Sequence, residues 1–178
     1  MKINIKTLAM LAVAGLFTLN ANAQLKTPAA SPTQTLDQAF ALSNIKIEYS
    51  RPSAKGRVIF GDLVPFGKVW RTGANASTKV TFGEDVKIEG MPLAAGTYAL
   101  YTIPNKDSWE VMFYKDLKLG GDVAEYKAEN EVLKVKVATI AFPVKMETFT
   151  MNVSDITSNT ANIVIVWENT RVAIKVSA

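Results

Sequence analysis

Residues 163–167 read Ile-Val-Ile-Val-Trp, five apolar residues in a row ahead of the polar stretch Glu168-Asn169-Thr170. A short run of this kind, rich in β-branched residues, predicts a central strand that is buried on both faces. Elsewhere in the chain apolar residues alternate with polar ones, as they do in strands with one solvated face. The segments that predict further strands are 45–49, 98–103, 109–114, 133–137, 149–153 and 172–176.

Short polar segments separate these predicted strands. Glu89-Gly90 suits a two-residue hairpin, and Asn105-Lys106-Asp107 and Glu168-Asn169-Thr170 are expected to divide other pairs of strands. A spacing of about 8–12 residues per strand favours an all-β protein, namely a single antiparallel β-sandwich of jelly-roll or Greek-key type with about 9–11 strands. Little helix is expected, and residues 117–130 fit either a loop or a loop with one helical turn, because Gly120-Gly121 disfavours a longer helix.

Residues 1–23 have the layout of a secretory signal peptide. Two lysines precede the apolar run 8–19, which is too short to span a membrane stably, and Ala21-Asn22-Ala23 fits the small-x-small cleavage pattern. We therefore expect cleavage after Ala23, a flexible lead-in over 24–38 and one β-sandwich domain over 39–178. The mature chain is expected in the periplasm or outside the cell, without a membrane span.

The charge of the mature chain is ordinary. Cleavage removes Lys2 and Lys6, which leaves 18 basic against 16 acidic residues and lowers the net charge from +4 to +2. Basic and acidic residues are interspersed along the chain, which is typical of a soluble surface, whereas nucleic-acid binding calls for a basic patch. We therefore expect no nucleic-acid partner, and the sequence leaves the oligomeric state open.

The complete absence of His and Cys excludes several chemistries. A Ser-His-Asp triad, thiol catalysis and ordinary zinc sites all need one of these residues. The sequence also has no phosphate-binding loop and no EF-hand calcium loop. We therefore expect no metal site and no cofactor.

One segment carries the candidate ligand-binding residues. Trp70, Arg71 and Asn75 bring an aromatic ring, a guanidinium and an amide into six positions, a set that suits a sugar or a carboxylate. Glu147 shares parity with the apolar residues of segment 149–153, so it is expected on the buried face, paired with Arg57 or Arg71. The same five residues also fit a structural role, in which Trp70 is core and the arginine forms a buried ion pair.

The functional hypothesis is therefore a non-enzymatic envelope protein that binds a small ligand, a glycan or a protein partner. One alternative is a hydrolase or lyase that works through Arg71, Glu147, Lys115 and Tyr101, since His and Cys are missing. Another is a purely structural domain without a site.

The motifs of the chain resemble those of the bacterial domain of unknown function 2911 family. The residues that carry the resemblance are Tyr49-Ser50-Arg51-Pro52, Lys55-Gly56-Arg57, Phe60-Gly61, residues 63–75, residues 93–100 and Thr102-Ile103-Pro104. The resemblance covers residues 40–178 and implies an exported protein of Bacteroidetes type, but it implies no activity. After Asp116 the chain departs from the family pattern, because it has Leu117-Lys118-Leu119-Gly120-Gly121 and a single Tyr126 where the pattern has an aromatic residue, glycine and Tyr-x-Tyr.

Overall fold

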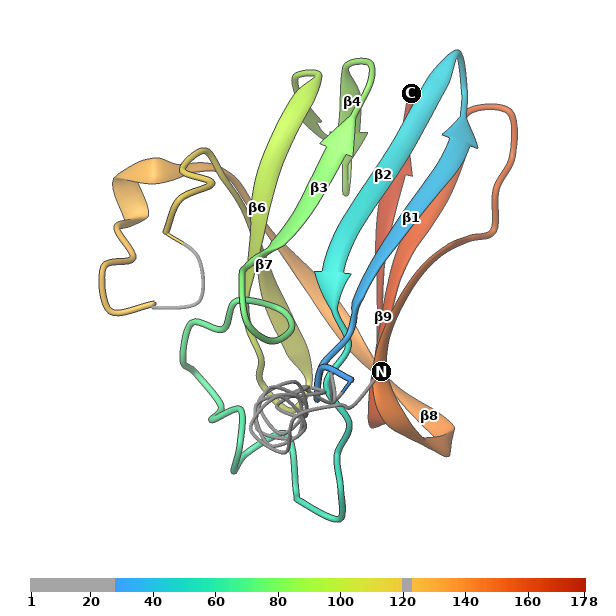
Figure 1. The fold of residues 1–178 in the computed structure, drawn as a ribbon. Coiled ribbons are helices and arrows are strands. Elements are labelled where there is room, and N and C mark those ends of the chain that lie inside the picture. The colour runs from blue at the N-terminus through green and yellow to red at the C-terminus, as the bar shows by residue number, and fades with distance from the viewer. Residues whose placement is uncertain (1–27, 120–122) are drawn as a thin grey trace, which may run out of the picture.

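The structure is a computed structural model that describes residues 28–119 and 123–178, so the expected signal peptide lies outside the described residues. It contains nine strands and one turn of 3₁₀ helix (Figure 1). In chain order they are β1 (Thr33–Phe40), β2 (Ser43–Ser50), β3 (Thr78–Phe82), β4 (Val86–Ile88), β5 (Met91–Leu93), β6 (Gly96–Ile103), β7 (Ser108–Tyr114), η1 (Ala128–Asn130), β8 (Glu131–Ser154) and β9 (Thr160–Ser177).

The strands form one antiparallel sheet in the order β1-β2-β3-β6-β7-β8-β9-β4-β5, which is not closed. The all-β antiparallel class and the expected number of strands are confirmed. The sheet is continuous because β8 is long: its residues 131–138 pair with β7, and its residues 139–154 pair with β9. Toward the other end of the order, β4 lies between β9 and the edge strand β5, and its Lys87 and Ile88 pair with Ser177 and Val176 of β9.

The sheet folds over, so that β2 packs on the second half of β8. The Tyr49 hydroxyl accepts a hydrogen bond from the Met151 N–H at 3.0 Å and lies 3.1 Å from the Met151 carbonyl oxygen. The Tyr49 ring meets the Phe149 ring edge-on, with 5.7 Å between centroids. These contacts join residues about a hundred positions apart, and they enclose the core between the two halves of the sheet.

Two turn predictions have opposite outcomes. The Glu89–Gly90 hairpin is confirmed, because both residues have positive φ (50° and 84°), as a tight two-residue turn requires. The turn at Glu168–Thr170 is wrong, since β9 runs unbroken through these residues. Glu168 has a φ of 48°, and the register with β8 shifts here, so the strand bends and continues instead of reversing.

Strand β1 begins at Thr33, inside the segment expected as a flexible lead-in. Its alternation is weak because most of its residues are polar, and only Phe40 is buried. The strand is held by its full-length pairing with β2, from Thr33 opposite Ser50 to Phe40 opposite Ser43. The single turn η1 falls within residues 117–130, which agrees with the prediction of a loop with one helical turn.

The main core contains a group of aromatic side chains at one end of the fold. Trp70 lies 6.1 Å from Trp167 in a stacked arrangement, 5.3 Å from Phe149 and 6.1 Å from Trp109, measured between ring centroids. Phe60 meets Trp109 at 5.0 Å and also contacts Trp70 and Trp167. We call these five residues the aromatic cluster, and their mutual contacts add to the stability from simple burial.

A second, smaller core lies on the other face of β6 and β7. Its aromatic members are Tyr101, Tyr114 and Tyr126, with 4.8–5.3 Å between ring centroids. The Tyr126 hydroxyl donates to Glu131 at 2.9 Å, and the Tyr114 hydroxyl accepts from the Lys127 N–H and from Asn130. The segment after β7 is therefore packed onto the sheet through tyrosine.

These tyrosines predict a loss of stability at high pH. Burial raises the pKa of Tyr101 and of Tyr126 above the usual 10.0, and for Tyr126 the hydrogen bond to Glu131 raises it further. Because the folded-state pKa exceeds the unfolded-state value, the unfolded chain ionises first. We expect the free energy of unfolding to be unaffected by these groups below pH 10 and to fall above it, by at most about 1.4 kcal/mol per pH unit for each hydroxyl.

Urea unfolding between pH 7 and pH 12 measures this slope. Tyr126→Phe should flatten the decline above pH 10, since it removes one of the ionising groups. An equal slope in the wild-type protein and in Tyr126→Phe would contradict the assignment to this residue.

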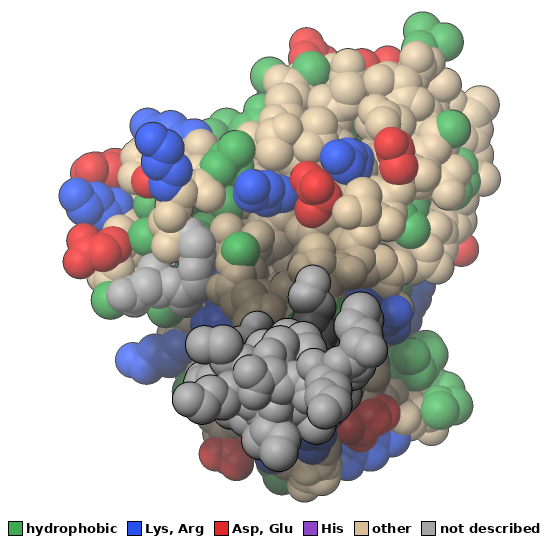
Figure 2. All heavy atoms as spheres, in the orientation of Figure 1, with side chains coloured by type: hydrophobic (Ala, Val, Ile, Leu, Met, Phe, Trp, Pro, Cys, Tyr) green, Lys and Arg blue, Asp and Glu red, His purple; other side chains and the backbone are tan. Residues whose placement is uncertain are grey.

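Among the described residues, no helix is long and apolar enough to cross a membrane. On the face shown in Figure 2, basic and acidic side chains are interspersed over the strands.

Candidate functional site

The loop of residues 51–77, which joins β2 to β3, carries the unusual sequence segment and is fixed at both sides. On one side, Trp70 exchanges two backbone hydrogen bonds with Thr102 of β6, at 2.8 and 2.9 Å. On the other side, the Ala54 N–H donates to the Glu147 carbonyl oxygen at 2.8 Å, next to a bridge between Ser53 and Thr148 of β8. The loop is therefore anchored to two strands, and it contributes Phe60 and Trp70 to the aromatic cluster.

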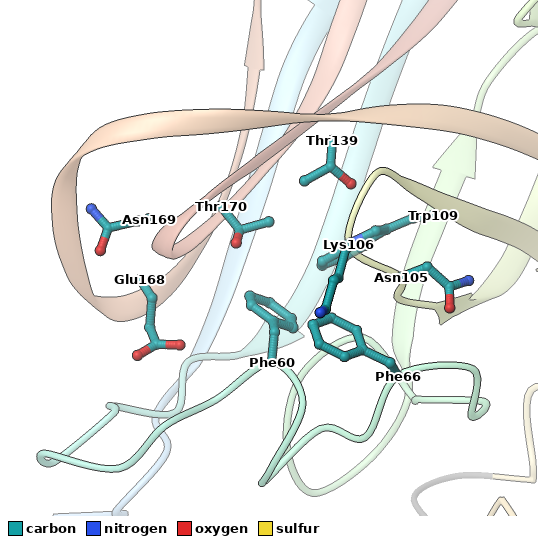
Figure 3. A pocket seen from close by; sticks show the side chains of 9 residues that line it. All are labelled: Phe60, Phe66, Asn105, Lys106, Trp109, Thr139, Glu168, Asn169 and Thr170. Carbon is teal, nitrogen blue, oxygen red and sulfur yellow. The ribbon is translucent and has the colours of Figure 1, made fainter.

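An open cleft of about 280 Å³ lies where this loop meets the bend of β8 and β9 (Figure 3). Its lining combines three aromatic rings with amide, hydroxyl and charged side chains. The lining residues are Phe60, Phe66, Asn105, Lys106, Trp109, Thr139, Glu168, Asn169 and Thr170. Trp109 is only 1% exposed and belongs to the wall, whereas Phe60 and Phe66 are half-buried. We call this feature the aromatic cleft.

Local backbone geometry sets the position of the two phenyl rings. Gly61 has a φ of 98°, and a Cβ at this position would stand 2.8 Å from the Phe66 ring. Only glycine therefore lets Phe66 lie over the backbone that follows Phe60. The Gly67 N–H then donates to the Pro104 carbonyl oxygen at 2.9 Å, which ties Phe66 to the end of β6.

The charged groups of the aromatic cleft differ in how they are held. Glu168 accepts a hydrogen bond from the Ile59 N–H at 3.0 Å, and its other oxygen lies 3.7 Å from the Lys145 ammonium. Glu168 thus ties the 51–77 loop to the bend of β9. Lys106 is exposed, and no ion pair of Lys106 occurs within the described part of the chain. The Thr139 hydroxyl oxygen is buried in the lining and has no hydrogen-bond partner among the described residues.

Three of the five sequence-predicted binding residues come together, but in a different cavity. Arg57, Trp70 and Arg71 line a cavity of about 240 Å³, together with Trp167 and six smaller or apolar residues. Trp70 is 8% exposed, and its indole N–H donates to the Gly73 carbonyl oxygen at 3.1 Å. Its contacts with the aromatic cluster make Trp70 a core residue.

Within the described chain, neither arginine has the predicted role, which was an ion pair with Glu147. The Arg57 guanidinium donates to the carbonyl oxygens of Ser53 (2.8 Å) and Ala54 (2.9 Å), so it closes its own loop. Arg71 lines the same cavity as Trp70, and its charge also reaches Tyr101 of the second core. Burial is the main influence on the pKa of Tyr101, and the Arg71 charge acts on it in the lowering direction.

Asn75 and Glu147 lie apart from these residues. Asn75 lines a third cavity, of about 250 Å³, and its amide donates to the Ser31 carbonyl oxygen and to the Ser50 hydroxyl. Glu147 is exposed, and its carboxylate accepts the Lys55 N–H at 2.7 Å. The expectation that Glu147 faces the core is wrong, because the register of β8 shifts between Met146 and Thr150 and resets the alternation. An ion pair of Glu147 with either arginine is not among those that the described residues form.

The four residues of the enzymatic alternative are not collected in one place. Tyr101 is fully buried in the second core, and Lys115 is exposed just after β7. Of the three cavities described here, one includes Arg71 and none includes Tyr101, Lys115 or Glu147. The geometry does not assemble the acid, base and cation that this alternative needs.

The aromatic cleft was not predicted from the sequence, although two signals for it were present. Phe60-Gly61 and Phe66-Gly67 both place glycine after phenylalanine, a pattern that allows a ring to be presented on a tight turn. The contribution of Glu168, Asn169 and Thr170 had no such signal, because it depends on the bend of β9.

Fold and site together define an all-β antiparallel protein in which a clamped loop and a strand bend enclose an open aromatic cleft. A family model matches residues 31–176, and the family is described as a protein of unknown function, DUF2911. The chain belongs to this family. No significant match was found among curated proteins or among solved structures.

Proposed function

We propose that the chain is an exported, non-enzymatic binding protein that holds a glycan in the aromatic cleft. The observation that carries the proposal is the convergence of half-buried Phe60 and Phe66 with Lys106, Asn105 and Thr170 around one open cavity. A sugar ring has an apolar C–H face and a periphery of hydroxyl groups. The phenyl rings suit the first, and the amide, hydroxyl and ammonium groups suit the second. Export is proposed from the signal-peptide pattern of residues 1–23.

Two features support binding without catalysis. Glu168 is the one carboxylate among the described lining residues, and its oxygens are engaged by the Ile59 N–H at 3.0 Å and by the Lys145 ammonium at 3.7 Å. The cleft is small and open, which suits the end of a glycan chain or a short oligosaccharide held at the surface. In this proposal the cleft recognises its ligand and releases it unchanged.

The test is calorimetric titration of the mature chain with a panel of neutral and acidic oligosaccharides, comparing wild type with Phe66→Ala. Removing a ring that contributes about 1.5–3 kcal/mol on burial should weaken binding by about ten- to a hundredfold. Trp109 in the cleft wall supplies an independent readout, since its fluorescence should change on binding.

Val58→Ala is the matched control, because Val58 is an apolar residue of the same loop, is 59% exposed and does not line the cleft. It should bind like the wild type. If no oligosaccharide binds, or if Phe66→Ala binds as well as the wild type while both are folded, the proposed function is wrong. Binding of a protein partner through the same cleft would replace it.

A further inference from the structure

We infer that the ligand of the aromatic cleft is acidic, namely a glycan that carries carboxylate groups. This inference rests on the proposed function and concerns the same site. It follows from the charges of the described lining residues, which are one ammonium, on Lys106, and one carboxylate, on Glu168. The carboxylate already has a counter-charge in Lys145, at 3.7 Å, whereas the ammonium has none within the described chain.

The position of Lys106 is fixed by its turn. The residues on both sides of it are anchored, because the Pro104 carbonyl oxygen accepts the Gly67 N–H and the Asp107 carbonyl oxygen accepts the Thr139 N–H, at 2.9 and 3.0 Å. The backbone around Lys106 is therefore held in place, whereas its exposed side chain can change conformation. Figure 3 shows its amino group reaching into the cleft on the side where Phe66 lies.

The two charges of the cleft are separated. In Figure 3 the Glu168 carboxylate lies on the other side of Phe60 from the Lys106 amino group. Glu168 is also held in place by its hydrogen bond from Ile59. A sugar stacked on the phenyl rings can thus present a carboxylate to Lys106 without meeting the negative charge of Glu168.

The aromatic cleft favours a carboxylated sugar because its phenyl rings and its ammonium group lie next to each other (Figure 3). An inorganic anion gains from Lys106 but nothing from Phe60 and Phe66, and a neutral sugar gains from the rings only. A charge pair at a partly exposed site is modest in strength, so we expect a preference for the acidic sugar of about three- to tenfold.

The experiment compares tetragalacturonate with its carboxyl-reduced counterpart, which has the same linkage and length but no charge. Calorimetric titrations at low salt use the mature wild-type chain, Lys106→Gln and Lys68→Gln. Lys68 is the matched control, because it is an exposed lysine of the 51–77 loop that does not line the cleft. Wild type and Lys68→Gln should favour the acidic tetramer by about three- to tenfold, and Lys106→Gln should bind both tetramers equally.

The outcomes separate the two proposals. Equal binding of both tetramers by the wild type overturns the acidic ligand and leaves the glycan-binding cleft standing. A preference that survives in Lys106→Gln, or disappears equally in Lys68→Gln, also overturns it, because the charge effect is then not local. Binding of neither tetramer, nor of any glycan in the panel, overturns the proposed function itself.

Discussion

Replacing Trp70 with alanine is expected to destabilise the protein by about 3–5 kcal/mol, the cost of removing a large aromatic side chain from a packed core. Trp70 contacts four other rings of the aromatic cluster, and its own backbone forms the bridge to Thr102. Its loss also leaves the Gly73 carbonyl oxygen without its indole partner. Urea unfolding followed by circular dichroism measures the change.

Two further variants make this result interpretable. Trp70→Phe keeps most of the apolar contact and loses the hydrogen bond, so an intermediate loss of about 1–2 kcal/mol is expected. Leu42→Ala removes a side chain that is 98% exposed and should change stability by no more than about 0.5 kcal/mol. A Trp70→Ala protein of nearly unchanged stability that fails to bind glycans would return Trp70 to the recognition role suggested by the sequence.

Tyr49→Phe is expected to cost about 2–4 kcal/mol, although it removes a single oxygen atom. The buried Tyr49 hydroxyl accepts from the Met151 N–H, and its one proton is shared between the Met151 carbonyl oxygen at 3.1 Å and Gln34 Oε1 at 3.0 Å. Without it, two backbone groups lose their partner, and each buried group left unsatisfied costs about 1–3 kcal/mol. The measurement is again the free energy of unfolding in urea.

Tyr98→Phe is the matched control, because within the described residues its hydroxyl makes a single hydrogen bond, to the Ala94 carbonyl oxygen at 2.9 Å. A loss of about 1 kcal/mol is expected there. If the two variants were equally stable, the link between β2 and β8 would contribute nothing beyond an ordinary hydrogen bond.

Local patterns in the sequence predict most of the strands, because a strand with one buried face must alternate. Segments 45–49, 109–114 and 149–153 all lie within strands, and the Glu89–Gly90 hairpin has the required backbone angles. Strand β1 was not predicted because it is held by its pairing with β2, and its own side chains are mostly polar.

The candidate site was much harder to predict, and Glu147 shows why. Parity along a strand assigns faces correctly only while the register is unbroken, and one shifted residue moves every later side chain to the other face. The register of β8 shifts on both sides of Met146, so parity counted from Phe149 fails two residues away. Phe60, Lys106 and Glu168 meet in the cleft through contacts across the sheet, which local periodicity does not encode.

The pairing of Lys87 with Ser177 bears on how the chain is made. The β4–β5 hairpin finds its neighbour only in the last residues of β9, and β8 completes one half of the sheet only when β9 is present. Topologies dominated by such distant pairings fold slowly, since the long loops between partners must be closed first. The sheet therefore cannot be completed during synthesis until β9 has left the ribosome, so the pairing of β4 and of residues 139–154 of β8 is a late event in folding.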